Sequence, residues 1–198
     1  MAQGGQRHEG ERPTDAQRES LLAPWRDSYM RSLSDDAKAQ ASGAKAAPGT
    51  FLSRYWDSPQ DDEQNLVIAR VGEGACAGMI LLNKFPYANG HLLVAMGEAR
   101  VRLMEYSPEQ RAAFWRMVDM ACALAETALE PQGLNVGLNQ GGAAGAGVPG
   151  HLHAHVVPRW HGDVNFISVV GELRVIPTGL AQMAGRYREV WAEIAARF

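Results

Sequence analysis

The chain of 198 residues is poor in cysteine and has only Cys76 and Cys122. Each of them lies inside an apolar segment, which favours buried free thiols over a disulfide framework and predicts a reducing compartment. No stretch approaches the roughly 18 apolar residues of a membrane span, and the first residues lack the apolar core of a signal peptide. We therefore expect a cytoplasmic protein with no membrane association.

An excess of positive charge is also absent. The chain has 19 basic and 22 acidic residues, which gives a formal net charge of −3, and no long block of like charge. This balance excludes an extended surface for nucleic acid. It does not exclude a pocket for a small anion, because the net charge does not report the local field.

Little in the first 20 residues can be buried, since they are polar, charged and contain glycine. We expect residues 1–20 to form a disordered arm and residues 21–198 to form one domain. Within that domain, "LLAPWRDSYMRSLS" is predicted to dock on the core, and residues 35–50 are predicted to be a loop.

The rest of the chain alternates between the patterns of strands and helices. The runs "NLVIAR", "ACAGMILLN" and "HLLVAM" are separated by turn residues and predict three antiparallel strands. A long helix follows, capped by Ser107, with Pro108 at its first position and Gln110 completing a capping box. Further along, "LNVGLNQ" and "HLHAHVV", the latter closed by Pro158, predict two more strands, and residues 179–198 predict a last helix. The fold class is therefore α+β, with a five-stranded antiparallel sheet, a long helix and a C-terminal helix.

Three of the six histidines occupy alternate positions in "HLHAH". In an extended strand His151, His153 and His155 share one face, with about 6.6 Å between successive residues. Such a row is compatible with zinc binding, with catalysis by a nucleophilic imidazole, and with histidines that serve only structure. The spacing favours catalysis but leaves all three open.

A glycine-rich loop, "NQGGAAGAGVPG", leads directly into this row. Its backbone N–H groups could hold a phosphate beside the imidazoles, or it could be a flexible connection. Its position next to the histidines favours phosphate binding.

Together, these motifs resemble the histidine triad (HIT) family of nucleotide hydrolases and transferases. The block "NKFPYANGHLLV" strengthens the resemblance, and "HVVPRWHGDVNF" and "LLAPWRDSY" are similar to its diadenosine tetraphosphate phosphorylase (adenylyltransferase) branch. The resemblance extends from about Leu21 to the C-terminus and implies a HIT-like fold.

The resemblance implies an enzyme that cleaves an adenine dinucleoside polyphosphate at the α-phosphate, with water or inorganic phosphate as the acceptor. His153 would form a nucleotidyl-histidine intermediate, His155 would bond to the leaving group and help to protonate it, and His151 would orient the row. Alternatives are a hydrolase of nucleoside phosphoramidates or nucleotide sugars, and a nucleotide-binding module without turnover. The acidic balance disfavours a DNA-repair role.

The resemblance also implies a set of substrate-binding residues, which are Asn83, His91, Asn139, Gly145, Gly147 and Trp160. His91 matches a fourth family histidine near the triad, or it is an interior histidine bonded to backbone. Asn83 would contact the nucleoside and Asn139 would lie near the phosphates, or both are turn amides. Trp160 would shape the pocket or pack at a subunit surface.

The chain departs from the family pattern at two places, which bear on a structural zinc site and on the group that accepts the nucleotide. Bacterial relatives often carry Cys-x-x-Cys in a structural zinc site, whereas residues 49–52 here read "GTFL". We expect no structural zinc and no required cofactor, apart from a divalent cation that accompanies the polyphosphate. Residues 146–150 lack the side-chain donor that relatives carry, which disfavours phosphorolysis more than nucleotidyl transfer. Relatives pair into dimers, so we expect a homodimer.

Overall fold

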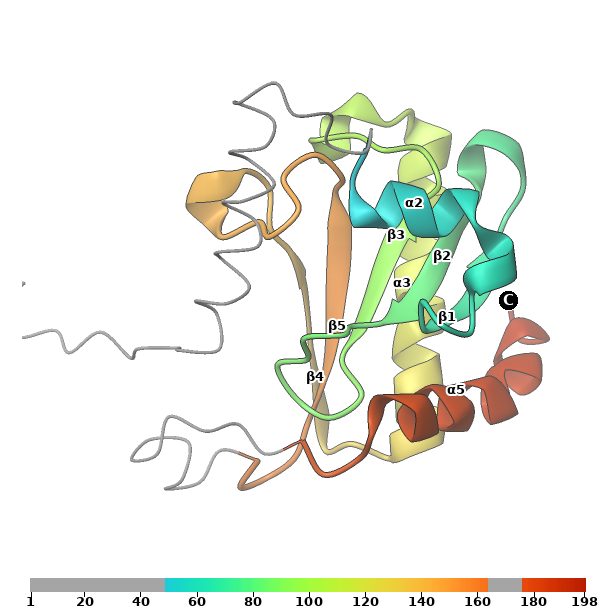
Figure 1. Cartoon of the computed structure of the whole chain (residues 1–198), viewed down its shortest axis with the longest axis vertical. Coiled ribbons are helices and arrows are strands. Elements are labelled where there is room, and N and C mark those ends of the chain that lie inside the picture. The colour runs from blue at the N-terminus through green and yellow to red at the C-terminus, as the bar shows by residue number, and fades with distance from the viewer. Residues whose placement is uncertain (1–48, 164–175) are drawn as a thin grey trace, which may run out of the picture.

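The computed structural model describes residues 49–163 and 176–198. Within them, five antiparallel strands form one sheet in the order β1-β2-β3-β5-β4 (Figure 1). The strands are β1 (Val67–Val71), β2 (Gly78–Leu82), β3 (Leu92–Met96), β4 (Gly133–Leu138) and β5 (His153–Arg159). The α-helices are α2 (Phe51–Asp57), α3 (Pro108–Leu129) and α5 (Leu180–Ala195). The predicted α+β fold is confirmed, whereas the arm at 1–20 and the segment docked on the core lie outside the described residues.

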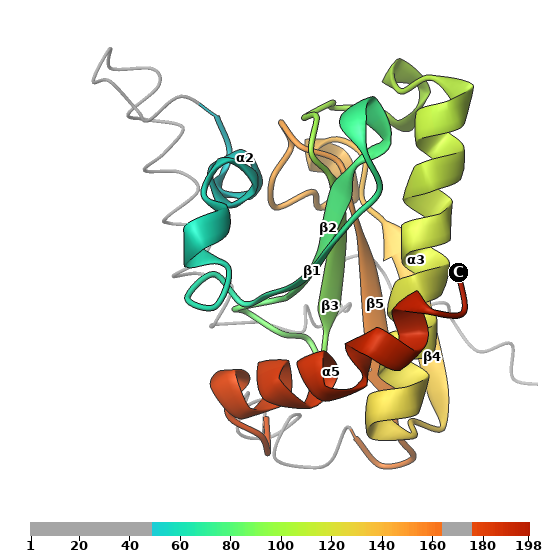
Figure 2. The same ribbon diagram turned by 90° about the vertical axis from the view of Figure 1, so that its right-hand side faces the viewer.

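Helices cover both faces of the sheet. Figure 2 shows α3 and α5 on one face and α2 on the other. Alternate residues of each strand therefore enter different cores, as β2 shows: Ile80 and Leu82 pack with α3 and α5, whereas Met79 and Leu81 pack with α2. Because both faces are covered, every residue of β2 and β3 is buried.

The long helix α3 begins where its sequence predicts. The Ser107 hydroxyl accepts from the Gln110 N–H at 3.2 Å, and the Gln110 side chain accepts from the Ser107 N–H at 2.9 Å, which is the expected capping box. The left-handed residue Glu130 follows the last turn, and Pro131 prevents its continuation.

Three details differ from the sequence prediction. The helix α2 was not predicted, although Thr50 caps it and its apolar residues recur at helical spacing. His151 lies before β5 rather than within it. Pro158 does not close β5: it pairs with Leu134 of β4, while the β3 ladder ends at Val156, so the missing N–H interrupts no bond on that side.

None of the helices in the described ranges is long and apolar enough to span a membrane.

Candidate active site

The strand β5 divides its side chains between the two faces of the sheet. Leu152, Ala154 and Val156 enter the core formed with α3 and α5. The imidazoles of His153 and His155 lie on the other face, where they neighbour Ala95 and Leu93 of β3. This is the face that α2 covers, so the sheet and helix form two walls around the histidines.

His153 has its tautomer set by the backbone. Its Nδ1 lies 2.9 Å from the carbonyl oxygen of His151, so Nδ1 carries the proton and donates. The Nε2 atom therefore holds the lone pair in the neutral ring. The ring is only 4% exposed, and its centroid lies 4.9 Å from that of His155. This arrangement gives His153 the form that a nucleophilic imidazole requires.

His155 has the opposite tautomer, set by a chain of hydrogen bonds. The Tyr87 backbone N–H donates to His91 Nδ1 at 3.0 Å, which leaves the ring proton of neutral His91 on Nε2. That Nε2 lies 2.9 Å from His155 Nδ1 and donates to it. The proton of neutral His155 is therefore on Nε2, where it can donate to a ligand. Neighbouring histidines thus present an acceptor and a donor.

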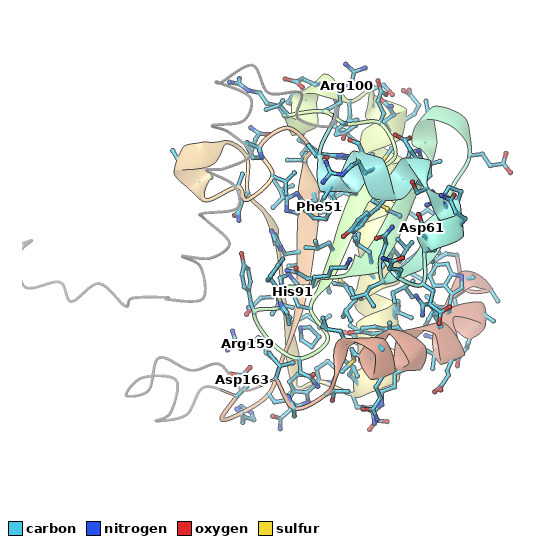
Figure 3. All side chains as sticks on the ribbon, in the orientation of Figure 1. Phe51, Asp61, His91, Arg100, Arg159 and Asp163 are labelled. Atoms are coloured by element: carbon cyan, nitrogen blue, oxygen red, sulfur yellow. The ribbon has the colours of Figure 1, made fainter. Side chains whose placement is uncertain are left out.

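His91 consequently belongs to the site without being part of the row. It is fully buried, it precedes β3, and it bonds both to backbone and to His155. Figure 3 shows the loop that carries His91 and its position beside β5. The ring of Tyr87, from the same loop, stacks on His155 with the centroids 5.7 Å apart. Tyr87 was not among the predicted site residues, although it lies in the block that carries the resemblance.

His151 is also fully buried, and both of its ring nitrogens have partners. Nε2 donates to the Met96 carbonyl oxygen at 2.8 Å, so Nδ1 is an acceptor. The hydroxyl oxygens of Thr50 and Ser53 lie 3.2 and 3.3 Å from this Nδ1. Sequence reasoning missed both residues. The sequence signal that could have revealed them is a helix start, with Thr50 as an N-cap before apolar residues at helical spacing.

Burial keeps the three imidazoles of the row neutral. Desolvation is the main cause in each case, and it lowers the pKa of His151, His153 and His155 below the usual value. The effect on His155, strengthened by His153, lowers its pKa to about 4. Near pH 7, His155 is therefore neutral and offers a hydrogen bond through its ring N–H, and its expected role in protonating the leaving group stays a prediction.

This pKa shift predicts a loss of stability in acid. The unfolded chain protonates His155 near pH 6.5, whereas the folded chain resists protonation until about pH 4. The unfolded state thus binds more protons in this window, and stability falls as the pH falls. Urea unfolding between pH 7 and pH 4 should show a contribution from His155 of about 3 kcal/mol. His155→Gln should reduce the pH dependence by this amount, and an unchanged dependence would contradict the assignment.

Two of the predicted substrate-binding residues are already engaged. The Asn83 side chain accepts from the Phe85 N–H at 2.9 Å and donates to His91 Nδ1 at 3.2 Å, so it supports the His91 loop. The Gly145 N–H donates to the Gly142 carbonyl at 2.9 Å. Asn83 lies beside the row through its bond to His91, whereas Gly145 bonds to Gly142 and Asn139 of its own loop.

Asn139 and Gly147 lie on either side of the short helix η5 (Gly142–Ala144), in the glycine-rich loop. The Asn139 amide makes a long contact of 3.5 Å to the Gly145 carbonyl. No partner for the Gly147 N–H is found among the described residues. Of the two predicted glycine donors, Gly147 is therefore the one whose N–H is available to a phosphate.

Trp160 and Arg159 lie at the other end of β5. Trp160 follows the strand, and its backbone is about 16 Å along the strand from His155, so the structure does not bring it to the imidazoles. The Arg159 guanidinium is bonded to Asp163 at 2.6 Å and to Asn135 at 2.9 Å. Arg159 is therefore paired with a carboxylate of the protein, that of Asp163. Figure 3 shows this pair at the opposite end of β5 from Arg100, which lies near the start of the strand.

The residues around His151 do not suit a structural zinc ion. Thr50 lies within residues 49–52, the stretch that was compared with Cys-x-x-Cys, and Ser53 directly follows it. Their hydroxyl groups are not among the thiolate, imidazole and carboxylate ligands of structural zinc sites. In the described part of the chain, no group of three or more His, Cys, Asp or Glu residues is arranged to hold a metal ion.

We therefore expect the purified protein to hold far less than one zinc per chain. Metal analysis should show this directly, and EDTA should leave the midpoint of thermal unfolding unchanged, because structural zinc contributes to folding free energy where it is present. A stoichiometric zinc content, or a marked fall in the midpoint with EDTA, would contradict the prediction.

Comparison of the sequence with known proteins identifies related chains. The HIT domain model matches residues 77–162. The AP-4-A phosphorylase of Mycobacterium tuberculosis is 34% identical over 176 residues, which are 89% of this chain and 86% of that protein. The asymmetrical bis(5'-nucleosyl)-tetraphosphatase of Schizosaccharomyces pombe is 30% identical over 82 residues, covering 41% of this chain and 44% of that one.

Two solved structures of histidine triad proteins have a similar fold. A zinc-bound histidine triad family protein from Mycobacterium smegmatis has 28% identity and a TM-score of 0.52, covering 67% of this chain and 88% of its own. A hypothetical histidine triad nucleotide-binding protein from Sulfolobus tokodaii, at 20% identity and a TM-score of 0.58, shares the fold over 73% of this chain and 95% of its own. The predicted resemblance, including its phosphorylase branch, is confirmed. The chain belongs to the histidine triad (HIT) family.

Proposed function

We propose that this protein cleaves dinucleoside polyphosphates of the diadenosine tetraphosphate type at the α-phosphate, through a nucleotidyl-His153 intermediate. The observation that carries the proposal is the pair of opposite tautomers: His153 presents a lone pair on Nε2 beside the Nε2 proton of His155. A nucleophile beside a hydrogen-bond donor suits nucleotidyl transfer, because the first attacks the phosphorus and the second bonds to the leaving group. The names of the phosphorylase and tetraphosphatase relatives support the same class of substrate.

In the first step, the Nε2 lone pair of His153 attacks the α-phosphorus. A nitrogen–phosphorus bond forms, and the bond from phosphorus to the bridging oxygen breaks. The leaving polyphosphate takes the electron pair and accepts a hydrogen bond from His155. The imidazole of the intermediate is then cationic, and the His151 carbonyl, which accepts from Nδ1–H at 2.9 Å, stabilises that charge.

In the second step, an oxygen of water or inorganic phosphate attacks the same phosphorus. The nitrogen–phosphorus bond breaks, and its electron pair returns to Nε2 of His153. The acceptor's proton, where it has one to lose, passes to solvent. With water the products include AMP, and with phosphate they include ADP, so the two acceptors give different nucleotides from one intermediate.

Substrate contacts are proposed for the residues that the glycine-rich loop and the His91 loop hold near the row. The Gly147 N–H and the Asn139 amide would bind phosphate oxygens, and Gly145, whose own N–H is bonded to Gly142, would shape the loop around them. Asn83, which also accepts from the Phe85 N–H, would contact the ribose. A divalent cation would arrive with the polyphosphate, and no resident cofactor takes part. Trp160 would contribute only where the substrate extends along β5.

We also propose that the protein is a cytoplasmic homodimer. The strand β4 is an edge strand in the described sheet, and Val136 is 44% exposed on it. An exposed apolar edge can pair with a second copy. Val136→Lys should lower the sedimentation coefficient to that of a monomer, because two like charges would face each other near the paired edges. A monomeric wild-type protein would contradict the proposal.

The acceptor is tested with diadenosine tetraphosphate in the presence and absence of inorganic phosphate, followed by separation of the nucleotides. ADP that forms only with phosphate identifies a phosphorylase. AMP that forms under both conditions identifies a hydrolase. Wild-type protein that binds AMP but turns over no nucleotide, including phosphoramidates and nucleotide sugars, would overturn the catalytic proposal in favour of a binding module.

A further inference from the structure

We infer that two hydroxyl groups at the start of α2, those of the N-cap residue Thr50 and of Ser53, position the nucleophile by holding the ring of His151. The inference rests on the proposed function, since it assigns a role in the same reaction. Neither residue touches the reacting atoms, so both are positioning residues rather than catalytic ones.

The contact between α2 and His151 is formed by three polar atoms, each within hydrogen-bonding distance of the other two. Thr50 Oγ1 and Ser53 Oγ lie 3.2 and 3.3 Å from His151 Nδ1, and the two oxygens lie 3.1 Å from each other. Nδ1 must accept, because Nε2 donates to the Met96 carbonyl. One hydroxyl therefore donates to the ring, and the other donates to the first hydroxyl. The acceptor on His151 is satisfied only while α2 is in place.

His151 is thereby fixed between two elements. Its Nε2 is bonded at the end of β3 through Met96, and its Nδ1 is bonded at the start of α2. The main chain is held as well, because the Leu152 N–H donates to the Arg100 carbonyl at 2.7 Å. The carbonyl between these bonds is the one that accepts from His153 Nδ1–H. A shift of the His151 ring would consequently move the acceptor that orients the nucleophile.

The helix α2 is itself immobilised, although it is short. Leu52 is fully buried in the core on this face of the sheet. Trp56 lies over Gly97 so closely that a Cβ there would come within 2.4 Å of its ring. The Thr50 methyl likewise approaches Gly150, where a Cβ would lie 3.3 Å away. Because α2 is packed this tightly, its hydroxyls form a rigid support for His151.

The test compares the double variant Thr50→Val/Ser53→Ala with Thr50→Ser, which keeps both hydroxyls. Loss of an outer hydrogen bond that orients a metal-bound histidine typically costs about 10- to 100-fold in activity, and we take the same range for the support of His151. We expect kcat of the double variant with diadenosine tetraphosphate to fall by this factor and KM to stay within about two-fold, because substrate contacts are unaltered. Thr50→Ser should retain kcat within about two-fold.

A matched control separates positioning from loss of stability. Thr50 also caps α2, and Ser107 caps α3 away from the site. Ser107→Ala should lower stability without changing kcat. A second readout needs no substrate: in protein labelled with ¹⁵N at histidine, the Nδ1 resonance of His151 should move downfield in the double variant, because the nitrogen loses its hydrogen-bond donors. It should be unchanged in Ser107→Ala.

A fall in kcat with rescue by Thr50→Ser and a shifted His151 resonance supports the inference. Unchanged kcat in the double variant, or an equal fall in Ser107→Ala, overturns it. If the wild-type protein turns over no nucleotide, the proposed function fails by itself. The His151 resonance then decides whether the hydroxyls hold the ring, and an unshifted resonance overturns that too.

Discussion

Replacing His153 by alanine is expected to abolish turnover of diadenosine tetraphosphate, with a fall in kcat of at least about 10⁴-fold, as loss of a nucleophile causes in other enzymes. The variant has no nitrogen to form the covalent intermediate. Its fold should be preserved, since the side chain is replaced by a smaller one on a strand held on both sides by β3 and β4. Rapid-quench kinetics and mass spectrometry of the intact protein check the result, because only wild type should carry a nucleotidyl adduct.

His161→Ala is the matched control for this experiment. His161 is an exposed histidine in the turn after β5, away from the row, and it should leave kcat unchanged. Both variants should still bind AMP, measured by calorimetry. If His153→Ala retained a substantial fraction of the turnover of wild type and His161→Ala, the assignment of the nucleophile would be wrong.

Replacing His91 by leucine has the second largest expected effect, because it removes the donor that sets the tautomer of His155. Without the bond from His91 Nε2, the proton of His155 is free to occupy Nδ1, and its Nε2 then no longer donates to the leaving group. In a related case, loss of the group that sets a catalytic tautomer lowers kcat by about 10⁴-fold. For His91→Leu we expect kcat to fall by at least about 10²-fold. The effect is smaller than in that case because a hydrogen bond, and not a proton transfer, is lost.

His91→Gln tests the reason for this effect. A glutamine can place an amide N–H near the position of Nε2, so it should restore part of the lost kcat, whereas leucine should not. The pattern of ring nitrogens in ¹⁵N spectra should change for His155 in the leucine variant. Equal activity of the two variants would show that His91 acts through packing and not through the tautomer.

The structure distinguishes among the three chemistries that the spacing of the row left open. The imidazoles do not converge on one point, since His153 bonds to backbone, His155 bonds to His91, and His151 bonds to Met96. A merely structural row would have no reason to present a lone pair beside a donor. The opposite tautomers of His153 and His155 therefore favour catalysis.

Much of the fold follows from local patterns. The capping box at Ser107, the helical period after it, and the alternation of histidines with apolar residues each involve neighbours within a few positions. Such patterns report secondary structure and the face on which a side chain lies. They located the sheet, both long helices and the histidine row.

The sequence by itself therefore determined the five strands, the two long helices, the row and the family to which the chain belongs. Only the tertiary structure decided the tautomers, because the partners lie far apart in the chain: His91 and His155 are 64 residues apart, and Thr50 and His151 are 101 apart. It also revealed α2, which has helical spacing but, at seven residues, is shorter than the window in which periodicity identifies a helix. Periodicity describes neighbours along the chain, whereas hydrogen-bond partners are chosen by the way the sheet and the helices pack.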